Sequence, residues 1–92
     1  MSTTLQFKTP LSLENIELLT DLEITRKGPV RHKGTEYWLK DEEGNLAMAE
    51  TFKTEDGIFV DSITRYGQNR IETIIEALKD SFDLSEEDFI EV

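Results

Sequence analysis

The stretch from Thr35 to Ile63 constrains the fold most, because it indicates three short strands joined by two tight turns. The strand runs are rich in β-branched and aromatic residues: Thr-Glu-Tyr-Trp-Leu-Lys, Leu-Ala-Met-Ala-Glu-Thr-Phe and Ile-Phe-Val-Asp-Ser-Ile. The segments between them, 41–45 and 53–57, contain Asp, Asn and Gly, which tolerate the left-handed backbone of hairpin turns. We therefore expect an antiparallel β-meander over residues 35–64.

An amphipathic helix is predicted over residues 68–82. Asn69 is the expected N-cap, with Glu72 placed to reach back to the cap. Apolar residues then recur at helical spacing and form one stripe: Ile71, Ile74, Ile75, Leu78 and Phe82. We expect this stripe to cover one apolar face of the meander, so Asp in place of Ile74 or Leu78 should unfold the domain.

The N-terminal segment is less clearly patterned. Residues 3–8 alternate weakly and fit an edge strand that Pro10 would end. Ser12 fits a helix N-cap, whereas residues 16–25 alternate with a period of two, as a strand does. A short turn or helix near 11–15 is preferred, and helix and strand both remain open for residues 11–22.

The strand that follows this turn should begin at Ile16 or Leu22 and end at Arg26, before a loop that contains Gly28 and Pro29. Together with the end of the strand, the loop forms the only basic cluster in this acidic sequence: Arg26, Lys27, Arg31, His32 and Lys33. One interpretation of this cluster is an anion-binding loop, but a phosphate site needs more glycines leading into a helix. A solvated turn is therefore the preferred interpretation.

These expectations give an α+β fold in which an antiparallel meander of three to five strands is covered on one face by a C-terminal amphipathic helix. Ninety-two residues supply one core, so residues 1–92 are taken as a single domain. Its segments are the N-terminal segment with the basic loop (1–34), the meander (35–64), the helix (68–82) and an acidic tail (83–92).

No catalytic or cofactor motif is recognisable. The chain has no cysteine and one histidine, so a zinc site would need His32 with carboxylates. The run from Asp41 to Asn45 lacks the alternating ligands and distal Glu of a calcium loop. Neither a nucleophile motif nor a glycine-rich cofactor fingerprint occurs. We expect no enzyme activity, no cofactor and no metal. The lack of a signal-like or membrane-spanning apolar segment leads us to expect a cytoplasmic protein.

The strongest functional signal is negative charge. Twenty acidic and ten basic residues give a net charge of −10, which disfavours binding to nucleic acid or to anionic membranes. Residues 71–92 hold eight acidic residues and one basic residue. Seven of them are the predicted partner-binding residues: Glu72, Glu76, Asp80, Asp83, Glu86, Glu87 and Asp88.

The leading hypothesis is a small acidic protein-binding module that docks a basic partner protein through this helix and tail. In its sharper form the module is an inhibitor or nucleic-acid mimic acting on a nuclease or nucleic-acid-binding protein. The plainer interpretation is that the charge keeps a small protein soluble.

A second hypothesis places the interface on the sheet. In a strand, the side chains of Trp38 and Leu39 point to opposite faces of the sheet. Trp38 is therefore either part of the core or an exposed aromatic anchor, depending on which face is covered. If it is exposed, the protein is a sheet-mediated homodimeric structural or regulatory protein with an aromatic face. The sequence leaves the two positions of Trp38 open.

Overall fold

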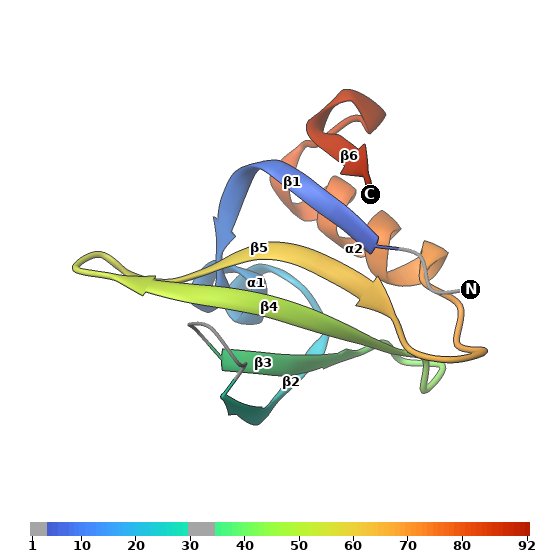
Figure 1. The fold of residues 1–92 in the computed structure, drawn as a ribbon. Helices are drawn as coiled ribbons and strands as arrows, with labels where there is room; N and C mark the ends of the chain where they lie inside the picture. Colours follow the sequence, from blue (N-terminus) through green and yellow to red (C-terminus); the bar gives the residue numbers. More distant parts are fainter. Residues whose placement is uncertain (1–3, 30–34) are drawn as a thin grey trace.

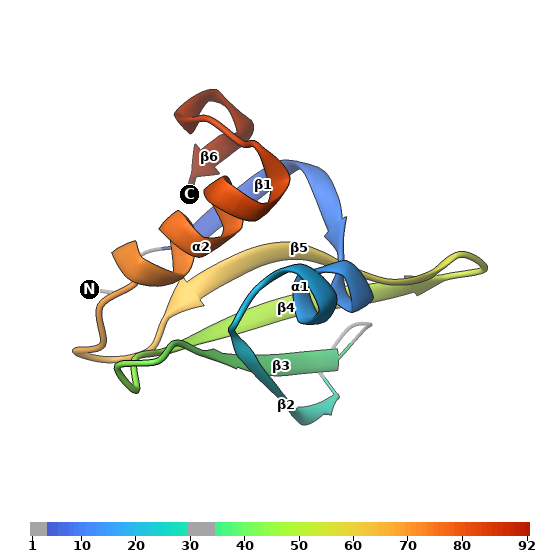
Figure 2. The ribbon, with the colours of Figure 1, turned by 180° about the vertical axis from the view of Figure 1, so that it is seen from behind.

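The computed structural model describes residues 4–29 and 35–92, and these form a six-stranded antiparallel sheet with two α-helices (Figures 1 and 2). The elements are β1 (Thr4–Ser12), α1 (Leu13–Leu19), β2 (Glu23–Pro29), β3 (Thr35–Lys40), β4 (Leu46–Thr54), β5 (Gly57–Arg65), α2 (Glu72–Phe82), the 3-10 helix η1 (Glu86–Asp88) and β6 (Phe89–Glu91). The strand order is β2-β3-β4-β5-β1-β6. The α+β class and the antiparallel sheet are confirmed, and the sheet has one strand more than the largest number predicted.

The predicted meander is present and extends from β2 to β5. Both predicted turns close hairpins: Asp41–Asn45 joins β3 to β4, and Glu55 with Asp56 joins β4 to β5. Gly44 and Gly57 take φ angles of +89° and +129°, which residues with a Cβ rarely adopt. The turn chemistry in the sequence therefore fixes where the chain reverses.

β1 was expected to be an edge strand ended by Pro10, and this prediction is wrong. The strand continues to Ser12 and lies between β5 and β6. Its register with β5 jumps between Gln6 and Leu11, so Pro10 falls in the interrupted part of the ladder, where its missing N–H is harmless. Figure 1 shows the resulting bend in β1.

Residues 13–19 form a helix rather than a strand. Ser12 caps α1 as predicted, its Oγ accepting a hydrogen bond from the Asn15 N–H at 3.3 Å. Ile16 lies within α1 and is fully buried there, so a strand beginning at Ile16 is wrong. A start near Leu22 is close to the observed first residue of β2, Glu23, and β2 continues past Arg26 to Pro29.

The apolar stripe of α2 contributes to a single hydrophobic core. Ile71, Ile74, Ile75 and Leu78 are buried in the same cluster as buried residues of β3, β4 and β5, among them Leu39, Ala49, Val60 and Ile63. Phe82 is partly buried and packs against this cluster. That α2 covers one whole face of the sheet stays a prediction.

The predicted cap of α2 is wrong. The helix begins at Glu72, with Ile71 at the N-cap position and no side-chain cap. Asn69 instead accepts a hydrogen bond from the Leu46 N–H at 3.0 Å and donates to the Tyr66 carbonyl at 2.7 Å. Its side chain therefore ties the loop before α2 to the start of β4.

Part of the predicted basic loop cannot be compared with the structure. Arg31, His32 and Lys33 lie outside the described residues, as does any anion site they would form. Neither of the two described helices has the length and apolar composition required to cross a lipid bilayer.

Candidate functional site

Three of the predicted partner-binding residues lie on one side of α2, and a fourth, Asp83, follows the helix as its C-cap. Glu72, Glu76, Asp80 and Asp83 recur every three or four residues and are all exposed. The buried stripe of the helix lies on the opposite side. We call these four residues the acidic helix face.

The acids of the tail are placed differently. The chain leaves α2 through Asp83, whose φ of +54° ends the helix, so Glu86 and Glu87 belong to η1. Both are exposed, and Glu86 forms an ion pair with Lys79 at 3.4 Å. Glu86 and Glu87 follow α2 in the sequence, but they do not extend the row of acidic side chains along that helix.

Asp88 has a local structural role. Its carboxylate accepts hydrogen bonds from the Ser85 N–H at 2.8 Å and from the Ser85 hydroxyl at 3.4 Å, which completes a capping box around η1. This residue is half-buried, and its acceptor capacity is partly used within the turn. It is therefore the least suitable of the seven predicted acids for contact with a partner.

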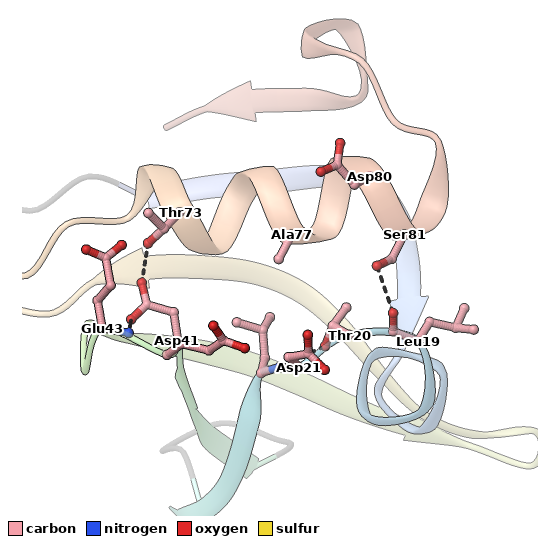
Figure 3. A pocket seen from close by; sticks show the side chains of 11 residues that line it. Leu19, Thr20, Asp21, Asp41, Glu43, Thr73, Ala77, Asp80 and Ser81 are labelled. Carbon is pink, nitrogen blue, oxygen red and sulfur yellow. Dashed lines mark hydrogen bonds between the residues drawn. The ribbon is translucent and has the colours of Figure 1, made fainter.

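A cleft of about 380 Å³ lies beside the acidic helix face, between α2, the α1–β2 connection and the β3–β4 turn (Figure 3). Its lining residues are Leu19, Thr20, Asp21, Leu22, Asp41, Glu42, Glu43, Thr73, Ala77, Asp80 and Ser81. Five of these described residues are acidic and none is basic. Asp80 belongs to both the cleft and the acidic helix face.

Hydrogen bonds of Asp41 hold one end of the cleft. One carboxylate oxygen accepts the Glu43 N–H at 2.9 Å and the Asn45 N–H at 2.8 Å; the other accepts the Asn45 side-chain amide at 3.1 Å and the Thr73 hydroxyl. Burial raises the pKa of Asp41, but the hydrogen bonds from Thr73, Asn45 and Glu43 outweigh it and bring the pKa below its usual value. The side chain therefore joins the β3–β4 turn to the first turn of α2.

A second hydrogen bond holds the other end of the cleft. The Ser81 hydroxyl donates to the Leu19 carbonyl at 2.9 Å, which joins the last turn of α2 to the end of α1. Figure 3 shows both links, Thr73 to Asp41 and Ser81 to Leu19. The walls of the cleft are therefore tied together at both ends.

This cleft was not foreseen from the sequence. Its walls come from three segments that lie far apart in the chain, around residues 20, 42 and 77. In the sequence, the acidic run Asp41-Glu-Glu indicates a turn and gives no sign of a cleft. Thr73 is the one sequence signal for the cleft, because it is a polar residue at the edge of the acidic helix face. The sequence does not show which residue its hydroxyl bonds, so the link to Asp41 could not be predicted.

Trp38 is neither core nor fully exposed. It lies on the face of the sheet opposite the buried Leu39, and its ring contacts Tyr66 edge-on with centroids 4.8 Å apart. Phe52 and Phe59 stack at 5.9 Å across β4 and β5. We call the half-buried and exposed aromatic residues Trp38, Phe52, Phe59 and Tyr66 the outer aromatic set.

In residues 4–29 and 35–92, no group of three or more His, Asp or Glu side chains is arranged to hold a metal ion.

Comparison of the chain with protein-family models, with curated proteins and with solved structures found no match.

Proposed function

We propose that this protein is a non-enzymatic binding module that docks a basic partner protein through the acidic helix face. The observation that carries the proposal is the exposure of Glu72, Glu76 and Asp80 on a helix whose opposite side is buried in the core, with the exposed Asp83 directly after the helix. We also infer that α2 lies across one face of the sheet, which would hold its carboxylates outward.

The arrangement has a local cost that favours a function for the charge. Glu72 and Glu76, like Glu76 and Asp80, are four residues apart, and like charges at this spacing destabilise a helix by roughly 0.2–0.5 kcal/mol per pair. Lysines among them would give a more stable helix. Clustered charge of one sign instead raises the rate at which an oppositely charged protein associates.

The spacing allows a comparison with nucleic acid. The carboxylates of Glu72, Glu76 and Asp80 are four residues apart along α2, which corresponds to about one charge per 6 Å of helix axis. One DNA strand carries one charge per roughly 3.4 Å. The helix line is thus less dense than a phosphate backbone. A basic protein partner of any kind fits it, and the nucleic-acid mimic or inhibitor remains the narrower version of the proposal.

The test begins with capture of partners from the native lysate at low and high salt, followed by association kinetics with a purified partner. The variant Glu72→Lys/Glu76→Lys/Asp83→Lys should slow association and remove its salt dependence. The matched control is Glu17→Lys/Glu50→Lys/Glu55→Lys, which changes the net charge equally at exposed positions outside α2. Equal binding by the two variants would show that total charge, and not this face, governs association.

The alternative is a homodimeric structural or regulatory protein that associates through the sheet. Its support is the outer aromatic set, two close aromatic pairs on partly exposed positions. Against it, two copies that each carry a charge of −10 repel one another at low salt. A dimer in sedimentation that is insensitive to salt and lost in Trp38→Ala would favour this alternative.

A further inference from the structure

We infer that the cleft beside α2 is a subsite for an arginine side chain of the basic partner. This inference rests on the proposed function and names the chemistry that the partner presents. Among the described lining residues the charges are all negative, while the cleft wall also contains Leu19, Leu22 and Ala77. A ligand that fits both is a cation carried on an apolar stem.

The cleft has the size and floor for such a side chain. Its volume of about 380 Å³ lies at the lower end of the roughly 300–1,000 Å³ of small-ligand pockets. Leu22 is buried and Ala77 half-buried, whereas Leu19 is 56% exposed at the rim. The methylene stem of an arginine would cover the part of this apolar surface that is exposed, chiefly at Leu19.

The carboxylates at the rim are free to accept hydrogen bonds. Asp21, Glu42, Glu43 and Asp80 are exposed, and within residues 4–29 and 35–92 none of them forms an ion pair. Asp41 is different because its oxygens already accept four hydrogen bonds. Asp21, Glu42 and Glu43 are therefore the recognising groups and Asp41 keeps the wall in place, whereas Figure 3 shows the Asp80 carboxylate directed away from the cleft.

Arginine fits this site better than lysine. The planar guanidinium presents five donors and can bond carboxylates on two walls at once, and it is more weakly hydrated than an ammonium group. The links from Thr73 to Asp41 and from Ser81 to Leu19 hold the walls before binding, so little backbone has to be ordered. Asp80 connects the cleft to the acidic helix face, so one partner can contact both.

Leu18 is an exposed apolar residue that precedes the cleft residue Leu19 in the chain. It is 69% exposed on α1. An apolar side chain adjacent to the arginine in the partner would pack against it.

The probe is a capped hexapeptide that contains one arginine beside one leucine, titrated into the full chain and followed by amide chemical shifts. The expected result is saturable shifts at Asp21, Ala77 and Ser81. The citrulline analogue, which keeps the shape and lacks the charge, should give none. Asp21→Asn/Glu43→Gln should weaken binding about tenfold, and the control Glu50→Gln/Glu55→Gln should not.

Three results would overturn the inference. The first is that only the backbone amides of Glu72 and Glu76 shift. The second is that a peptide with lysine in place of arginine binds with the same affinity. The third is that no amide shift saturates. The first would leave the proposed function intact, because the acidic helix face would still bind the cation. Conversely, the peptide could give saturable shifts in the cleft while the Glu72→Lys/Glu76→Lys/Asp83→Lys variant binds the partner as the wild type does. This outcome would support the subsite and refute the proposal that the acidic helix face docks the partner.

Discussion

At the level of single residues, Asp41 connects more of the molecule than its position in a surface turn suggests. Its carboxylate closes the β3–β4 turn and reaches the Thr73 hydroxyl on α2. We expect Asp41→Ala to lower the free energy of unfolding by about 2 kcal/mol, since it leaves several donors unsatisfied. Urea denaturation would measure this. Glu42→Ala, one residue along and exposed, should stay within about 0.5 kcal/mol of the wild type.

The same residue predicts a pH dependence. The folded-state pKa of Asp41 lies below its usual value, so the charged form is favoured by folding. Its stabilising contribution is present above the unfolded pKa, about 3.9, and is lost as the pH falls through the folded value. The stability difference between the wild type and Asp41→Asn should therefore shrink in denaturation curves measured from pH 6 down to pH 2.5. A constant difference would contradict the hydrogen-bonding scheme.

Trp38 offers an optical test of the outer aromatic set, because it is the only tryptophan. Tyr66, itself 46% exposed, covers one side of its ring. We expect Tyr66→Ala to shift the emission maximum of Trp38 to longer wavelength and to cost about 1 kcal/mol. The control is Leu18→Ala, which removes an exposed apolar side chain and should leave the emission maximum of Trp38 unchanged. An unchanged emission maximum in the Tyr66 variant would mean that the two rings are not in contact in solution.

Among the secondary-structure elements, α2 has two sides with different roles. Ile74 is fully buried, and Glu76 two residues later is exposed. Ile74→Ala should lower the free energy of unfolding by about 2–5 kcal/mol, and Ile74→Asp should prevent folding. Glu76→Ala should keep the melting temperature within a few degrees. Circular dichroism on heating separates these outcomes, and a folded Ile74→Asp variant would disprove the placement of the core.

The elements that depend on local pattern were predictable, and those that depend on distant partners were not. The helical stripe of α2, the Ser12 cap and the turns at Gly44 and Gly57 follow from short-range chemistry. Asn69 looked like a cap because Asn is common there, yet its amide bonds to Leu46 and Tyr66. The interior place of β1 depends on the break in its ladder around Pro10, which has no local signature.

For the molecule as a whole, one part of the candidate site could be predicted from the sequence and another part could not. Net charge and the line of acids along α2 can be counted in the sequence, and their exposure follows from helix periodicity. The cleft requires the fold, because Asp21, Glu43 and Asp80 come together only when three separate segments are packed. Asp88 was included among the predicted acids since nothing in the sequence separates a capping carboxylate from a free one.

The position of β1 also affects how the chain reaches its native state. Leu5 pairs with Ile63 on one side and with Glu91 on the other, so the first described strand finds both neighbours in the second half of the chain. Contacts this distant in sequence require large loops to close, which slows folding relative to proteins with local contacts. The β3–β4 and β4–β5 hairpins can form while synthesis continues. β1 must wait for the rest, and until then its hydrogen-bonding groups are open to other chains.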